Sequence, residues 1–92
     1  MTKIKFTDYE KIVDYLKAMR SILLITTKYN EDLSDKEWVH LRLAYSEIEH
    51  ELTSQYDDLD IHFYKKNTEE KLKSIDFLLA LFEIGRSAKV TI

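Results

Sequence analysis

The chain has 92 residues, with 14 Lys plus Arg against 17 Asp plus Glu, no Cys, no Pro and one Gly, and it carries a net charge of −3. Its length is that of one domain, and its apolar content of 45% is too high for a disordered chain. The absence of Cys excludes disulfides and thiolate metal ligands and suits a cytoplasmic protein. The longest apolar run is far shorter than the roughly 20 residues of a membrane span, so we expect no membrane association.

The scarcity of Gly and Pro favours helices, because tight β turns usually need residues that accept positive φ. The first predicted helix covers residues 8–28, with Thr7 and Glu10 as a capping box at its start. Its apolar residues recur at steps of three and four, which places them on one helical stripe. This stripe consists of Tyr9, Ile12, Leu16, Met19 and Leu23.

The second predicted helix covers residues 35–56, and Ser34 and Glu37 form the same capping pattern before it. Its apolar stripe has the same spacing and consists of Trp38, Leu41, Tyr45, Ile48 and Leu52. The connection between the first two helices, residues 29–34, is short. We therefore expect these helices to be antiparallel neighbours.

The third predicted helix covers residues 69–84, with Thr68 as its amino-terminal cap and Gly85 as a left-handed carboxyl cap. Its core stripe consists of Leu72, Ile75, Leu79 and Phe82. The second connection, residues 57–67, is longer and less regular than the first. The three helices predict an all-α fold, an antiparallel three-helix bundle that forms a single domain over residues 1–92. Apolar residues also alternate with polar ones in residues 59–64 and in the terminal segments, which allows a short strand pair as an addition to the bundle.

The third helix is apolar around nearly its whole circumference. Such a helix must be covered on all sides, and two other helices of this size do not easily enclose it. Either it is the central helix of the core, or part of its surface closes a homodimer or receives a partner. The sequence leaves both readings open.

Charge is strongly segregated along the chain. Residues 1–29 contain three acids and six bases, a balance of +3, and residues 65–92 contain four acids and six bases, a balance of +2. The acidic segment, which we define as residues 30–64, contains ten acids and two bases, a balance of −8. Its acids occur around both ends of the second helix and along the later turns of that helix. A surface with this much negative charge attracts a basic partner and speeds the encounter between the two proteins.

Two Glu-x-x-His pairs, Glu37 with His40 and Glu47 with His50, have the spacing of metal ligands on one helical face. Both pairs lie on the same predicted helix, however, and ten residues of helix turn them about 80° apart. We therefore predict no metal site and no cofactor. No serine lies in a glycine-flanked elbow, and one glycine cannot build a phosphate-binding loop, so we expect no catalytic residues and a protein that is not an enzyme.

These features favour a non-enzymatic interaction module, a small acidic inhibitor or modulator that occludes a basic surface of a partner protein. Such a surface includes one that normally holds nucleic acid, as an anti-defence protein of a phage or mobile element would require. Net acidity argues against direct nucleic-acid binding by this chain. The predicted partner-binding residues are Glu47, Glu49, Glu51, Tyr56, Asp57, Asp58 and Asp60. The alternative is a bacteriocin-immunity or antitoxin-like helical protein that binds through an apolar surface of the third helix.

Overall fold

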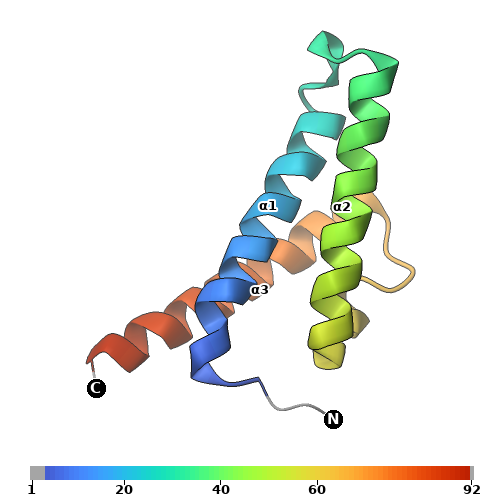
Figure 1. The fold of residues 1–92 in the computed structure, drawn as a ribbon. Coiled ribbons are helices and arrows are strands. Elements are labelled where there is room, and N and C mark those ends of the chain that lie inside the picture. The colour runs from blue at the N-terminus through green and yellow to red at the C-terminus, as the bar shows by residue number, and fades with distance from the viewer. Residues whose placement is uncertain (1–3, 92) are drawn as a thin grey trace.

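A computed structural model describes residues 4–91 of the chain, shown in Figure 1. These residues form three α-helices and three short 3-10 helices, and they contain no strand. The elements in chain order are η1 (Phe6–Asp8), α1 (Tyr9–Thr27), η2 (Asn30–Asp32), α2 (Asp35–Gln55), η3 (Asp57–His62) and α3 (Thr68–Thr91). The predicted all-α fold class is therefore confirmed, and the three long helices begin within one residue of their predicted starts.

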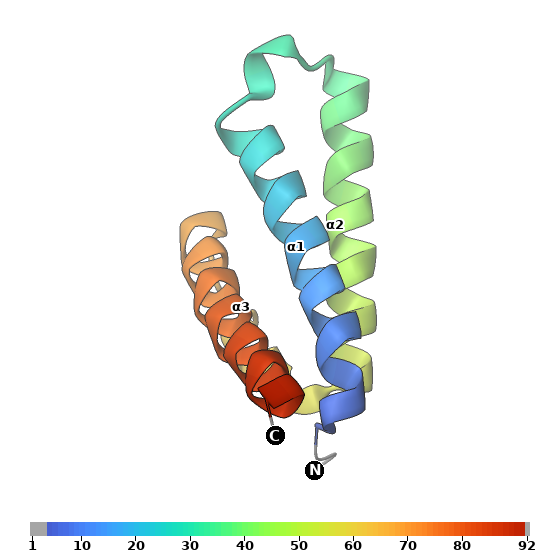
Figure 2. The ribbon, with the colours of Figure 1, turned by 90° about the vertical axis from the view of Figure 1, so that its left-hand side faces the viewer.

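The first two long helices form an antiparallel hairpin, as their short connection predicts (Figures 1 and 2). Trp38, near the start of α2, donates a hydrogen bond of 3.0 Å from Nε1 to the carbonyl oxygen of Thr26 at the end of α1. At the other end of the hairpin, the Tyr15 hydroxyl donates to Oε1 of Glu51 at 3.0 Å. These two hydrogen bonds, one at each end of the hairpin, fix the register of α1 against α2.

The third helix packs against α1 and crosses it obliquely, so that α1 lies between α2 and α3 (Figure 2). Arg20 Nε lies 2.8 Å from Asp76 Oδ1, and Lys17 Nζ lies 3.3 Å from Glu83 Oε1. Because the later residue of α1 pairs with the earlier residue of α3, these two helices are antiparallel. It follows that α2 and α3 run in the same general direction. The predicted antiparallel three-helix bundle, in which α3 would run opposite to α2, is therefore not confirmed in this respect.

The connection between α2 and α3 explains the difference, because it contributes to the core and turns the chain back. Leu59 and Phe63 are 3% and 2% exposed, whereas Ile61 between them is 74% exposed. A strand would place these three side chains on one face; a helical turn separates them in the way observed. The strand predicted for residues 59–64 is therefore wrong. Lys65, at a φ of 57°, then adopts the left-handed conformation that reverses the chain.

The terminal segments do not supply a strand either. Ile4 precedes η1 in irregular backbone, and Val90 belongs to α3, which extends seven residues beyond its predicted end at Ile84. Ile92 lies outside the described residues.

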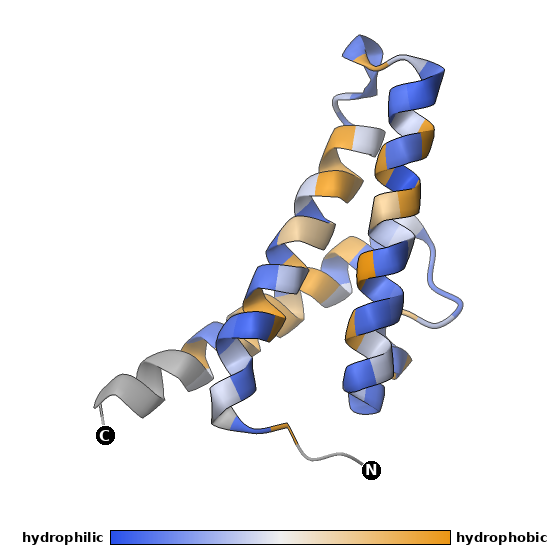
Figure 3. Cartoon of the chain, in the orientation of Figure 1, coloured by the Kyte–Doolittle hydropathy of each residue, from blue (hydrophilic) through white to orange (hydrophobic). Residues whose placement is uncertain are grey.

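The core follows the predicted stripes closely. Figure 3 shows hydrophobic residues concentrated on α1 and α3. The completely buried residues of α1 are four of the five predicted stripe residues together with Val13, and α2 contributes Tyr45 and Leu52. Trp38 departs from the prediction, because it is 40% exposed at the end of the hairpin where residues 28–34 connect α1 to α2. The buried apolar residues are Ile12, Val13, Leu16, Met19, Leu23, Tyr45, Leu52, Tyr56, Leu59, Phe63, Ile75, Leu78 and Phe82.

The capping box predicted at the start of α2 is confirmed. The backbone N–H of Glu37 donates to Oγ of Ser34 at 3.1 Å, and the Ser34 N–H donates to Oε1 of Glu37 at 3.0 Å. The box predicted from Thr7 and Glu10 does not form. Thr7 lies in η1, and α1 begins after Asp8 without a side-chain hydrogen bond to its first turn, because the preceding 3-10 turn already continues into the helix.

The two predicted ends of the third helix are also corrected. Asn67, not Thr68, caps it: the Glu70 N–H donates to Asn67 Oδ1 at 2.8 Å, and the Asn67 N–H donates to Glu70 Oε1 at 3.0 Å. Gly85 lies inside α3 with a helical backbone and is not a carboxyl cap. Its small size serves packing, because an added Cβ would lie 2.5 Å from Cε2 of Tyr9.

Candidate functional site

The acidic segment keeps most of its charge unpaired. Among the side chains that the structure describes, Glu49 is the only one of its ten acids that forms a salt bridge. The other described salt bridges join α1 to α3 and leave this segment untouched. Figure 3 shows α2 hydrophilic over much of its length. The surface of α2 and η3 therefore presents uncompensated carboxylates.

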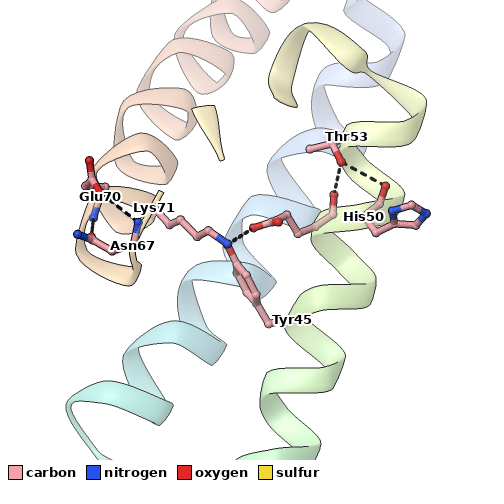
Figure 4. A network of polar contacts seen from close by, with 7 residues as sticks. Tyr45, His50, Thr53, Asn67, Glu70 and Lys71 are labelled. Atoms are coloured by element: carbon pink, nitrogen blue, oxygen red, sulfur yellow. Dashed lines mark hydrogen bonds and ion pairs between the residues drawn. The ribbon is translucent and has the colours of Figure 1, made fainter. Parts of the chain in front are cut away.

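Glu49 makes contacts within the chain and is not free to bind a partner. Its Oε1 lies 2.8 Å from Nζ of Lys71, which reaches from the first turn of α3 toward α2, and it accepts a 2.7 Å hydrogen bond from the Tyr45 hydroxyl (Figure 4). The side chains of Lys71 and Glu49 are only 18% and 24% exposed. This prediction of a partner-binding residue is thus not supported, because Glu49 joins α2 to α3 within the chain.

Contacts between cations and aromatic rings continue from the Lys71–Glu49 salt bridge along α2. The guanidinium Cζ of Arg42 lies 5.8 Å from the ring centroid of Trp38 and 5.5 Å from that of Tyr45, and Lys71 Nζ lies 5.2 Å from the Tyr45 ring. Such contacts stabilise by attraction between the cation and the ring face. Burial, together with the neighbouring Glu49 carboxylate, raises the pKa of Tyr45 far above its ordinary value of 10.0. Tyr45 therefore remains a neutral hydrogen-bond donor to Glu49.

Glu51 is exposed but has partners of its own. It accepts hydrogen bonds from the Tyr15 hydroxyl at 3.0 Å and from Nε2 of Gln55 at 3.2 Å. The hydrogen bond to Glu51 and partial burial raise the pKa of Tyr15. Neither partner is a cation, so Glu51 keeps its negative charge at the surface.

The remaining predicted contact residues differ in exposure. Glu47, Asp57 and Asp60 are exposed, and no described cation pairs with them, while Asp58 is half-buried. Tyr56 is only 6% exposed and belongs to the core. Burial and the nearby Asp8 carboxylate raise the pKa of its hydroxyl. Tyr56 is therefore unavailable as an exposed aromatic anchor.

A second surface of interest is apolar and lies on the outer side of α3. Phe77, Leu81 and Ile84 are 57%, 52% and 69% exposed, and their spacing of four and three places them on one face of the helix. We call these three residues the outer stripe. The sequence signal for it was the nearly continuous apolar content of this helix. The signal did not reveal which side of α3 would stay uncovered, because that depends on the position of α1.

The described residues also form a cavity, but its lining does not suggest a catalytic or metal site. This shallow cavity of about 280 Å³ opens between the end of α1 and the start of α3, and its lining consists of Thr27, Lys28, Thr68, Glu69 and Leu72. Within residues 4–91, no three His, Asp or Glu side chains come together as metal ligands would. None of the helices described is long and apolar enough to cross a membrane.

Comparisons of this chain with known protein families, with curated proteins and with solved structures found no match. The function of this chain is therefore inferred from the acidic segment and from the outer stripe of α3.

Proposed function

We propose that this chain is a non-enzymatic interaction module that acts in the cytoplasm as a small acidic inhibitor or modulator. It binds a basic surface of a partner protein, of the kind that normally contacts nucleic acid. An anti-defence protein of a phage or mobile element has a role of this kind. The observation that carries the proposal is the acidic segment, in which nine of the ten acids have no described cationic partner.

The proposed contact surface follows from the exposure of the individual acids. Glu47, Glu51, Asp57 and Asp60 form it, with half-buried Asp58 at its edge. The residues on α2 have a rigid helical backbone, and η3 is held by Leu59 in the core. Rigid carboxylates lose little conformational freedom on binding. Their field accelerates the encounter with a basic partner, and the helices then block that surface sterically.

The test is a charge reversal with a matched control. Glu47→Lys combined with Asp60→Lys changes two exposed acids of the proposed surface, and Glu10→Lys combined with Asp14→Lys makes the same charge change on α1. A partner captured from the host at low salt is identified, and its affinity for each variant is measured by calorimetry. We expect the first variant to weaken binding at least tenfold and the control to change it much less.

Ionic strength gives the second half of this test. If the acidic segment provides the attraction, affinity falls steeply as salt is raised, because exposed charges are screened within a Debye length of about 8 Å at physiological salt. Nucleic acid that binds the same partner should compete with the chain. An affinity unchanged by salt and by the reversal of Glu47 and Asp60 contradicts the proposal.

The outer stripe of α3 favours a second candidate function. An immunity or antitoxin-like protein would bind its target through Phe77, Leu81 and Ile84, all of which are more than half exposed. Apolar contacts of this kind respond little to salt. The salt titration therefore separates the two candidates, since only the acidic surface predicts a steep loss of affinity.

A further inference from the structure

We infer that the outer stripe of α3 is the contact surface of a homodimer, in which two copies of α3 pack against each other antiparallel across a twofold axis. This inference concerns a different surface from the acidic segment and does not depend on the function proposed for it.

The position of α3 in the fold is the first argument. α3 rests on α1 through Ile75, Leu78 and Phe82, which are at most 5% exposed, and no other long helix among residues 4–91 covers its opposite side. In Figure 2 it forms the outer layer of the molecule, with α1 in the middle. A second copy placed on α3 would complete a four-helix core in the order α1, α3, α3 of the partner subunit and α1 of the partner subunit. Both sides of α3 would then be covered.

The pattern of the stripe is the second argument, because it is complementary to itself. A twofold axis between Ala80 and Leu81 places Phe77 of one copy opposite Ile84 of the other, and it brings the two Leu81 side chains near the axis. Ala80 is exposed beside them and is small enough to let the helices approach closely. Twofold dimers of this kind are the commonest oligomers. A single stripe can therefore serve as both halves of the interface.

Charge does not oppose this pairing. The only charged residue from Phe77 to Ile84 is Glu83, which lies toward the flank and pairs with Lys17 of its own chain. Asp76, just before the stripe, pairs with Arg20 of its own chain. The centre of the contact therefore buries no unpaired charge, which would be expensive to desolvate.

The area of the stripe is the third argument. Three large apolar side chains that are each more than half exposed amount to roughly 300 Å², within the range of the largest patches on monomeric proteins. A standard interface buries about 800 Å² on each partner, a little more than half of it apolar. The stripe therefore supplies more than half of the apolar area that one partner of such an interface buries. We expect a dimer that forms reversibly with concentration.

The neighbouring connection supports the same face. The ring centroid of His62, at the end of η3, lies 6.0 Å from that of Phe77. A partner helix seated on the stripe would therefore also lie close to the end of η3, beside Phe77.

The first test measures mass in solution. By size-exclusion chromatography with light scattering at about 100 µM protein, we expect a mass of twice the 11.0 kDa of one chain. Leu81→Glu should return the mass to that of one chain. The matched control is Leu43→Glu on α2, because Leu43 is 57% exposed and Leu81 is 52% exposed. The control should remain dimeric.

The second test does not depend on how well Leu81→Glu folds. The chain has no Cys, so a single Ala80→Cys substitution can be cross-linked selectively with a short bis-maleimide. We expect a covalent dimer from Ala80→Cys and none from Ser46→Cys, an exposed control position on α2. A wild-type chain that stays monomeric at about 100 µM overturns the inference, as does a dimer that Leu43→Glu dissociates and Leu81→Glu does not. A monomer that binds a different protein through the stripe also overturns it.

Discussion

Gly85 of α3 faces the ring of Tyr9 in α1, so closely that a Cβ added at Gly85 would lie 2.5 Å from Cε2 of the tyrosine. The ring also packs edge-on against Phe82 with 5.0 Å between ring centroids, so moving it away would disturb that contact. Gly85→Ala should gain about 1 kcal/mol in helix propensity. Overpacking of this kind costs about 1 to 3 kcal/mol. We therefore expect a net loss of stability, measured as a lower free energy of unfolding in urea.

The control for this prediction removes the ring. In a Tyr9→Leu background the same Gly85→Ala change has no aromatic edge to displace, and it should then be neutral or stabilising. A Gly85→Ala effect of the same size in both backgrounds would show that the backbone of α3, and not Tyr9, is the reason for the glycine.

The capping box at the start of α2 predicts a specific dependence of stability on pH. Hydrogen bonds from the Ser34 backbone N–H and hydroxyl hold the pKa of the Glu37 carboxyl below its ordinary value of 4.5. Because the folded-state pKa is lowered, this contribution is present above the unfolded-state pKa and is lost as pH falls through the folded-state pKa. Glu37→Gln should therefore be less stable than the wild type at neutral pH. The difference should narrow as the carboxyl becomes protonated.

Thermal unfolding of both proteins, followed by circular dichroism at neutral pH and at a pH below the lowered folded-state pKa of Glu37, measures this difference. Asp35→Asn is a suitable control, because Asp35 lies in the same first turn of α2 but takes no part in the capping box. A gap between wild type and Glu37→Gln that stays constant across the titration contradicts the assigned role.

The connection before α3 should behave as part of the core. Phe63 is 2% exposed and the next residue, Tyr64, is 64% exposed. Phe63→Ala removes a buried aromatic ring and should cost about 3 to 5 kcal/mol. Tyr64→Ala should change the free energy of unfolding by less than about 0.5 kcal/mol. Equal effects in urea unfolding would mean that Phe63 in this connection does not contribute to the core.

The sequence predicted the helices and most of their inward faces, because the spacing of apolar residues and the capping residues at helix ends depend only on neighbouring positions in the chain. The capping pattern of Ser34 and Glu37 located the start of α2 correctly. The same pattern at Thr7 and Glu10 was misleading, since η1 leads directly into α1. Gly85 was also misread, because its role depends on Tyr9, which lies 76 residues earlier in the sequence.

The candidate site was harder to predict because it depends on contacts between helices. Nothing local distinguishes Glu49, which Lys71 neutralises, from Glu47, which stays exposed. Likewise, the segment containing Leu59 and Phe63 alternates in the way a strand does, and only its packing against the helices shows that it is a 3-10 turn. The direction of α3 followed from that segment and was therefore mispredicted with it.

The shared direction of α2 and α3 also has a consequence for how the chain folds. An up-and-down arrangement lets each helix dock on the one made just before it, so native contacts remain local. Here α3 must return past η3 to reach α1, and its salt bridge from Asp76 joins Arg20 across 56 positions of sequence. Because closing such long loops slows the search for the native state, we expect this chain to fold more slowly than an up-and-down bundle of the same length.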